Sequence, residues 1–198
     1  MVPSQVLQEA AIVIKQGGVV AFPTETYYGL GVDPFNEAAL DRLYRLKKRP
    51  SHKPLLTLIS HLDQLLTLAE TVPPCFSALI KLWPAPITLV FPARAGLSQR
   101  LTAGTHTVGV RMSPHPVAQH FVKYCGHPLT ATSANRSGAP PACSAKEVEE
   151  QFPSGLDYII DGGVTPGGVG STLVGIDKGK PLLLRRGVFD LEALPCKF

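Results

Sequence analysis

The chain has 198 residues, of which 44% are hydrophobic and 17% charged, and its formal net charge is +4. This composition predicts a globular protein with a sizeable core and excludes an intrinsically disordered chain. The sequence shows no apolar run long enough to cross a bilayer and no apparent signal peptide, so we expect one cytoplasmic domain over residues 1–198.

The four cysteines are scattered and form no C-x-x-C pair; they are Cys75, Cys125, Cys143 and Cys196. This spacing is typical of reduced thiols rather than of a disulfide framework or a zinc site. The six histidines also lack the spacings of zinc ligands. The sequence therefore predicts no structural metal held by the protein.

Helices and strands alternate along the chain. From caps and apolar residues at helical spacing, helices are predicted to begin near Ser4, Asn36, Ser60, Phe76, His115 and Ser144. Strands are predicted over residues 19–22, 55–59, 87–91, 107–112, 128–133, 158–160, 172–176 and 182–184. The segment 94–106 has no clear period and is predicted to be a loop. This order indicates an α/β fold with a twisted, open, mixed sheet and helices on both faces, ending in a hairpin.

The segment PTETYYGLG, residues 23–31, follows the first strand and is predicted to be a ligand-binding loop. It offers the hydroxyls of Thr24 and Thr26 and turns on Gly29 and Gly31, which would let backbone N–H groups approach a ligand. A tight turn with capping threonines explains the same residues. The pattern alone does not decide between these interpretations.

A basic cluster lies in KKRPSHKPL, residues 47–55; its members are Lys47, Lys48, Arg49, His52 and Lys53. A solvated helix end would tolerate such a run. Two prolines fix the backbone here, however, which favours a site for a polyanion such as phosphate. Arg111, at the carboxyl end of a strand, suits either a carboxylate or phosphate clamp or an edge residue whose charge reaches solvent.

Two further loops carry polar groups. Ser133 and Asn135 follow a predicted strand, but no G-x-S-x-G elbow surrounds the serine, so we expect hydrogen bonds to a ligand rather than hydrolysis. Residues 162–171 have the glycine content of a phosphate-binding nest but lack the G-K-[ST] ending of a P-loop.

Taken in order, the motifs of the chain resemble those of the YrdC-like threonylcarbamoyl-AMP synthases. They are PTETYYGLG, K-x-R followed by P-x-x-K-P-L, WPAPITLVF, TVGVRMSPHP, TSANRSG, IDGG, GVGSTLV and LLRRG, and they extend from about residue 17 to residue 187. The resemblance implies a YrdC/RibB-like fold with a large cationic cavity, without the additional C-terminal domain of longer members. It also implies a reaction in which L-threonine, bicarbonate and ATP, with Mg²⁺, give threonylcarbamoyl-AMP and pyrophosphate for tRNA modification.

The resemblance also implies roles for individual residues. Threonine would be bound by Thr26, Leu58, Arg111, Ala131 and Ser171. ATP would be bound by Arg49, Lys53, Thr107, Ser133, Asn135, Pro141 and Arg185. Lys47 and Arg49, the K-x-R pair, would serve the reaction itself. The chain departs from the family pattern at several positions. Leu58 replaces a histidine of some members, Pro141 replaces a serine, Lys53 stands where archaeal members carry asparagine, and WPAP replaces the commoner WPGP.

Three other functions stay open. A YciO-like paralogue would act mainly by binding RNA or nucleotides. An RNA-binding module would use the basic cluster, although an aromatic content of 7% offers few bases for stacking. Carbamoyl transfer in hydrogenase maturation normally comes with zinc-finger cysteines, which this chain lacks. The partners that the resemblance implies are ATP, L-threonine and bicarbonate. Further candidates are tRNA or tRNA-modification proteins, and no membrane is expected.

Overall fold

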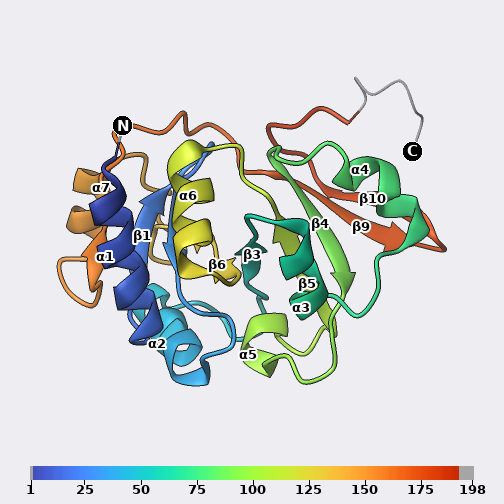
Figure 1. The fold of residues 1–198 in the computed structure, drawn as a ribbon, viewed down its shortest axis with the longest axis horizontal. Coiled ribbons are helices and arrows are strands. Elements are labelled where there is room, and N and C mark those ends of the chain that lie inside the picture. Colours follow the sequence, from blue (N-terminus) through green and yellow to red (C-terminus); the bar gives the residue numbers. More distant parts are fainter. Residues whose placement is uncertain (1, 192–198) are drawn as a thin grey trace.

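The computed structural model describes residues 2–191, which form two mixed sheets flanked by helices (Figure 1). The strands are β1 (Val20–Pro23), β2 (Tyr28–Gly31), β3 (Leu56–Leu58), β4 (Ile87–Pro92), β5 (Thr107–Arg111), β6 (Leu129–Thr130), β7 (Thr132–Ser133), β8 (Tyr158–Ile159), β9 (Thr172–Asp177) and β10 (Lys180–Arg185). The α-helices are α1 (Ser4–Lys15), α2 (Glu37–Lys47), α3 (Leu65–Leu68), α4 (Ser77–Ile80), α5 (Gln99–Thr102), α6 (Pro116–Cys125) and α7 (Ala145–Gln151). Two 3-10 turns lie at Leu62–Gln64 and Pro74–Phe76.

Helices cover both faces of the four-stranded sheet, whose order is β7-β2-β1-β8. Alternate residues of a strand point to opposite faces. Val20 and Phe22 of β1 therefore join one buried cluster with residues of α1 and α6, and Ala21 joins a larger cluster with residues of α2 and α7. The Phe22 ring packs edge-on against Phe121, with 5.2 Å between the ring centroids.

The six-stranded sheet, of order β10-β9-β4-β5-β3-β6, has an apolar face and a more polar one. Ile87 and Leu89 of β4 belong to the larger core cluster, together with residues near α3 and α4. Thr88 between them faces the other way, and its Oγ1 lies 2.8 Å from Oγ of Ser171. This polar face forms part of the pocket described below.

The expected single sheet is divided at Ala131. On one side of this residue β6 pairs with β3 of the six-stranded sheet, and on the other β7 pairs with β2 of the four-stranded sheet. The N–H of Ala131 donates to the carbonyl of Leu56 at 2.8 Å, and the N–H of Ala134 donates to that of Tyr28 at 2.7 Å. The α/β class and the mixed strand directions are confirmed, but the strand predicted over 128–133 belongs to both sheets.

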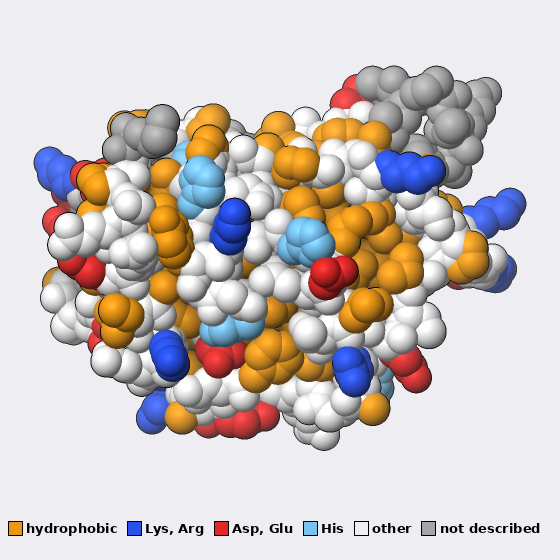
Figure 2. All heavy atoms as spheres, in the orientation of Figure 1, with side chains coloured by type: hydrophobic (Ala, Val, Ile, Leu, Met, Phe, Trp, Pro, Cys, Tyr) orange, Lys and Arg blue, Asp and Glu red, His pale blue; other side chains and the backbone are white. Residues whose placement is uncertain are grey.

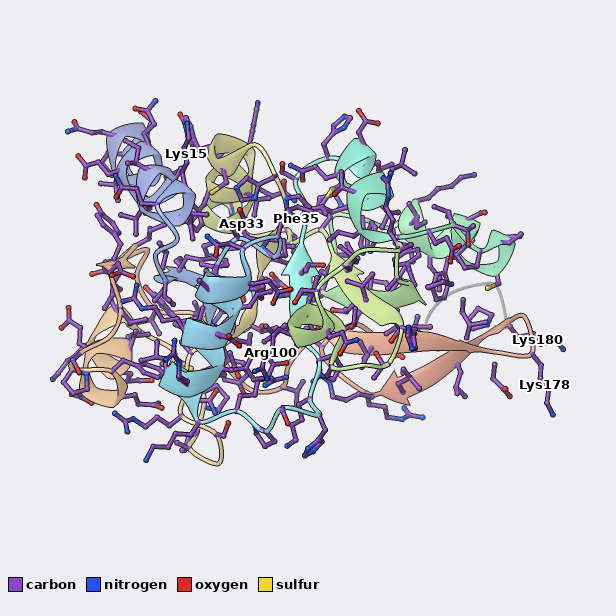
Figure 3. All side chains as sticks on the ribbon, turned by 90° about the horizontal axis from the view of Figure 1, so that it is seen from below. Lys15, Asp33, Phe35, Arg100, Lys178 and Lys180 are labelled. Atoms are coloured by element: carbon purple, nitrogen blue, oxygen red, sulfur yellow. The ribbon has the colours of Figure 1, made fainter. Side chains whose placement is uncertain are left out.

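Most predicted elements and caps are confirmed. The side-chain oxygen of Asn36 accepts a hydrogen bond from the N–H of Ala39 at 3.1 Å, and that of Ser144 accepts one from Glu147 at 3.2 Å. The predicted C-terminal hairpin is β9–β10, and Figure 3 shows Lys178 and Lys180 at its projecting tip. Within residues 2–191 no helix combines the length and apolar character that a membrane crossing requires.

Four local predictions are wrong. Ser4 is the first helical residue rather than the cap of α1, because Pro3 occupies the cap position without a side-chain bond. His61, rather than Ser60, caps the 3-10 turn at 62–64. The predicted loop 94–106 contains α5, whose single turn is too short to show a period and is capped by Ser98. Cys196 and the rest of the tail beyond residue 191 lie outside the described residues.

The fourth wrong prediction is the loop at the end of PTETYYGLG, because this stretch is a strand. Residues 28–31 form β2, which pairs antiparallel with β1, so that Gly31 lies opposite Val20. A Cβ at Gly31 would lie 2.9 Å from the ring of Phe22. This glycine is therefore required by packing against an aromatic ring rather than by a turn.

Figure 2 shows hydrophobic groups among polar ones on one face of the molecule, with Lys and Arg scattered across it.

We expect Gly31→Ala to lower the free energy of unfolding by about 1–3 kcal/mol, because the new methyl group overpacks the Phe22 ring. Urea denaturation of the wild type and the variant measures this difference. Phe22→Leu provides the matched test, since it makes room for the methyl group. The double variant should lose less stability than the sum of the two single variants, and an additive loss would contradict the proposed clash.

Candidate functional site

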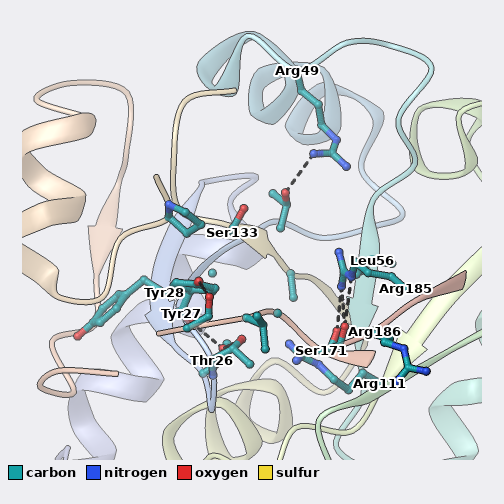
Figure 4. Close-up of a pocket in the computed structure, with 18 residues that line it drawn as sticks. Thr26, Tyr27, Tyr28, Arg49, Leu56, Arg111, Ser133, Ser171, Arg185 and Arg186 are labelled. Atoms are coloured by element: carbon teal, nitrogen blue, oxygen red, sulfur yellow. Dashed lines mark hydrogen bonds between the residues drawn. The ribbon is translucent and has the colours of Figure 1, made fainter. Parts of the chain in front are cut away.

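A pocket of about 430 Å³ is lined by residues from both sheets. Strands β2, β3, β5, β7 and β10 contribute to it, as do the turn after β1 and the segment 168–171 (Figure 4). Because its walls come from two sheets, the pocket depends on how the sheets are joined. A volume of this size is that of a small-molecule site.

Four arginines line this pocket: Arg49, Arg111, Arg185 and Arg186. No Asp or Glu is found among the described residues that line it. Figure 4 shows Arg49 on one side of the pocket and Arg111 and Arg185 on the other. The arrangement suits a ligand with negative charge near both ends, or two anionic ligands side by side.

Backbone carbonyls of the proline-bounded basic segment hold Arg49. Its Nε donates to the carbonyl of Lys53 at 3.1 Å and its Nη2 to that of Pro54 at 2.8 Å. Its Nη1 reaches Oγ1 of Thr132, on the pocket wall, at 3.4 Å. Burial lowers the pKa of Arg49, and the nearby Tyr44 opposes this effect. The segment therefore orients one guanidinium toward the pocket.

Lys47 is buried behind the pocket, with only 1% of its surface exposed. Its Nζ donates to the carbonyl of Ser133, to the carbonyl of Asn135 at 2.7 Å and to Oδ1 of Asn135 at 3.3 Å. Oγ of Ser133 donates to the same Oδ1 at 2.6 Å. Burial and the charge of Arg49 lower the pKa of Lys47 to about 7. Lys47 thus fixes the loop after β7 from behind.

On the opposite side of the pocket, Arg111 is held by a carboxylate. Its Nη1 donates to Oε1 of Glu25, and Oγ of Ser113 donates to Oε2. The side chains of Arg111 and Glu25 are 8% and 12% exposed, so this ion pair is nearly buried. Glu25 was not among the predicted site residues, although it lies between Thr24 and Thr26 in the first motif.

The glycine-rich segment 162–171 closes against the first motif. The N–H of Gly167 donates to the carbonyl of Thr26 at 2.7 Å, and the hydroxyl of Tyr27 donates to the carbonyl of Gly168 at 2.6 Å. At the end of the segment, Nη2 of Arg185 donates to the carbonyl of Ser171 at 2.8 Å. These bonds bring two distant glycine-containing stretches to one wall of the pocket.

The structure brings most of the predicted site residues together. The following line the pocket: Thr26, Arg49, Arg111, Ala131, Ser133, Pro141, Ser171 and Arg185. The following do not line it: Lys47, Lys53, Leu58, Thr107 and Asn135. Leu58 lies in the second core cluster, whereas Leu56, two residues earlier on β3, lines the wall. Lys53 is exposed beside Arg49, and the hydroxyl of Thr107 lies 2.9 Å from that of Thr105.

Arg186 and Tyr28 are among the pocket residues that were not predicted, and both carry weak signals in the sequence. Arg186 follows Arg185 and lines the pocket with it. Tyr28 belongs to the first motif, and its hydroxyl donates to the carbonyl of Gly163 at 2.8 Å. Within residues 2–191 no group of three or more His, Cys, Asp or Glu side chains could hold a metal ion.

Comparison with known proteins gives one consistent family. The Sua5, YciO and YrdC family model, described as telomere recombination, matches residues 12–187. A threonylcarbamoyl-AMP synthase of Pyrococcus abyssi is 41% identical over 186 residues, which are 93% of this chain but 55% of that protein. A protein of the same name from Idiomarina loihiensis is 41% identical over 157 residues, which are 77% of this chain and 84% of that protein. The chain thus spans about half the length of the first relative and most of the second.

Solved structures agree with these matches. Sua5 of P. abyssi in complex with L-threonine superposes with a TM-score of 0.92 at 40% identity, covering 97% of this chain and 57% of that one. YciO of E. coli gives a TM-score of 0.85 at 24% identity, covering 96% and 93%. A full-length HypF gives 0.79 at 18% identity, covering 91% and 29%. At these lower identities YciO and HypF show a shared fold, and neither favours its own function for this chain.

The buried amine of Lys47 predicts a pH-dependent stability. Its pKa falls from the usual 10.5 to about 7 in the folded protein, so between these values the unfolded chain binds more protons than the folded one. The contribution of Lys47 to the free energy of unfolding therefore rises with pH in this window. The free energy of unfolding of the wild type minus that of Lys47→Met should therefore rise by about 1.4 kcal/mol per pH unit between pH 8 and 9.

Urea denaturation at pH 7, 8 and 9 measures this difference. Lys146→Met is the control, because the side chain of Lys146 is 85% exposed and does not line the pocket. Its difference from the wild type should stay constant with pH. A constant difference for Lys47→Met as well would show that the buried amine keeps an ordinary pKa.

Proposed function

Because the chain belongs to the Sua5, YciO and YrdC family, we propose that it is a threonylcarbamoyl-AMP synthase that uses L-threonine, bicarbonate and ATP and releases pyrophosphate. The observation that carries this proposal is the pocket with arginines on opposite sides. One side suits a triphosphate and the other an amino-acid carboxylate. The names of the relatives and the L-threonine complex of Sua5 support the same pair of ligands.

We assign the triphosphate to the side of Arg49. Its guanidinium is held by carbonyls and faces the pocket, as does the hydroxyl of Ser133. Pro141 lines the same pocket, and Arg185 would reach the nucleotide from the opposite wall. Lys53 is exposed next to Arg49 and would meet phosphates beyond the pocket opening, and Thr107 would act at the periphery.

Lys47 has a supporting role in this proposal. Within residues 2–191 its Nζ donates only to Ser133 and Asn135, and Lys47 does not line the pocket. It therefore acts on ATP through the loop that carries Ser133, and its charge, when protonated, adds to the positive potential of that wall. Asn135 likewise acts by holding Ser133 in place, because its Oδ1 accepts a hydrogen bond from the Ser133 hydroxyl.

We assign L-threonine to the opposite side. Arg111 would bind the carboxylate, and the hydroxyls of Thr26 and Ser171 would bind the polar groups of the amino acid. Ala131 would contribute its backbone at the junction of the two sheets. Leu58 is in the core, so its contribution to this side is indirect, and Leu56 supplies the apolar contact instead.

The chemistry needs positioning more than a protein nucleophile. Threonine and bicarbonate form N-carboxy-threonine with loss of water, a carboxylate oxygen of this species attacks the α-phosphorus of ATP, and pyrophosphate leaves. Holding the two reactants in one pocket removes much of the entropic barrier. Fixed guanidinium groups stabilise the charge that develops on the phosphate oxygens.

Magnesium fits this site as a companion of ATP. Mg²⁺ commonly keeps several waters and binds substrate phosphates, so a cluster of protein carboxylates is not needed. The pocket lining supplies cations and hydroxyls that would surround such a complex. We further propose a cytoplasmic location and transfer of the product to tRNA through tRNA-modification proteins.

A pyrophosphate assay tests the proposal. With ATP and Mg²⁺ present, we expect pyrophosphate release to require both L-threonine and bicarbonate. Serine, which lacks the methyl group of threonine, and valine, which lacks its hydroxyl, serve as controls for recognition of the amino acid. Release that is independent of either threonine or bicarbonate would overturn the assignment.

Two neighbouring cations provide a matched pair of variants. Arg49→Ala should lower the rate of synthesis by about 10²–10³-fold, because a fixed charge beside the reacting phosphates is lost. Lys48→Ala should change the rate by less than about twofold, since Lys48 is exposed and does not line the pocket. Initial rates at saturating substrates measure both effects. Equal losses would contradict the placement of Arg49 at the phosphates.

A further inference from the structure

We propose that Glu25 is a positioning residue for the amino-acid end of the pocket, where it holds the guanidinium of Arg111 in the orientation that binds a ligand carboxylate. Glu25 does not line the pocket itself, so it acts through Arg111. The inference rests on the proposed function for the identity of the ligand, an α-amino acid. The ion pair on which it is built is independent of that identity.

The turn after β1 presents its side chains in two directions. Thr24 and Thr26 line the pocket, and Glu25 between them points to Arg111 and Ser113. Oγ1 of Thr24 donates to the carbonyl of Tyr27 at 2.7 Å and accepts from the N–H of Thr26 at 3.3 Å. These bonds make the turn rigid, so the position of the Glu25 carboxylate is fixed by the backbone.

Both oxygens of the Glu25 carboxylate are engaged with the six-stranded sheet. Oε1 accepts from Nη1 of Arg111, the last residue of β5, and Oε2 accepts from Oγ of Ser113 just after it. Glu25 itself belongs to the hairpin of the four-stranded sheet. The contact therefore joins the two sheets at the pocket and holds Nη1 of the guanidinium at a fixed place in the wall.

The geometry leaves Arg111 available to a ligand. Within residues 2–191 the side chain of Arg111 makes its hydrogen bond to Glu25 through Nη1 alone. Its Nε and Nη2 donors remain for a carboxylate in the pocket, where a bidentate contact is favourable. Glu25 and a ligand can thus bind the same guanidinium at different nitrogens.

Electrostatics explain why this arginine needs a carboxylate behind it. Burial lowers the pKa of Arg111, the charge of Glu25 opposes this effect, and the nearby Arg185 adds to the lowering. An uncompensated guanidinium at this place would be repelled by Arg185 and drawn toward solvent. Glu25 offsets both effects and keeps the cation in the wall.

Binding of L-threonine in the absence of ATP and bicarbonate tests the proposal by calorimetry. Glu25→Ala should weaken this binding at least tenfold, which is about 1.4 kcal/mol. The affinity of Glu25→Gln for L-threonine should lie between those of the wild type and Glu25→Ala, because its amide oxygen still accepts one hydrogen bond from Arg111 but carries no charge. Ser113→Ala, which removes one contact to the carboxylate, should weaken binding about two- to threefold. ATP affinity should stay within twofold in all three variants.

Controls separate positioning from general damage. Glu70→Gln changes an exposed glutamate and should bind L-threonine like the wild type. Equal losses of L-threonine and ATP affinity, or tighter L-threonine binding by Glu25→Ala, would overturn the proposal, because the second result would make Glu25 a competitor of the ligand. If Glu25→Ala does not fold, Glu25→Gln and Ser113→Ala decide the matter.

A crystal structure of Glu25→Ala separates this inference from the proposed function. We expect the Arg111 guanidinium to leave its position in the pocket wall even without a ligand. An unmoved guanidinium would overturn the positioning role. Failure of the wild-type protein to bind L-threonine would instead overturn the proposed function, and the ligand-free structure would still decide the role of Glu25.

Discussion

The pocket depends on one short stretch of backbone that pairs with two sheets. Residues 129–130 complete the six-stranded sheet and residues 132–133 the four-stranded sheet, with Ala131 between them. The hydrogen bonds on either side of Ala131 fix the distance between the sheet edges, and the pocket is the space that this junction leaves. A small side chain at residue 131 keeps that space open.

The second constraint is the placing of positive charge in a poorly solvated wall. Two kinds of partner hold four of these cations: backbone carbonyls hold Arg49, Lys47 and Arg185, and a carboxylate holds Arg111. Carbonyl partners leave the net positive charge of the pocket intact, whereas a carboxylate reduces it locally. Arg49, which backbone carbonyls hold, therefore keeps its full charge for a strongly anionic ligand such as a phosphate group.

The sequence allowed a correct prediction of the fold class and most elements, because strand and helix periods and caps are local signals. Most of the residues predicted for the site also line one pocket. It did not predict the division into two sheets, since a change of strand partner at Ala131 leaves no trace in hydrophobic periodicity. Nor did it predict β2, because Gly29 and Gly31 are typical of turns and the reason for Gly31 is the ring of Phe22, a residue on another strand. Glu25 was missed for the same reason: its partners Arg111 and Ser113 are distant in the chain.

The K-x-R pair shows why spacing alone does not assign a role. Lys47 is the last residue of α2 and points into the protein, toward the loop after β7. Lys48 then adopts a left-handed conformation, with φ of 50°, which ends the helix and redirects the chain. Arg49 consequently emerges on the pocket side. Two cations separated by one residue thus face different environments, one behind the wall and one in it.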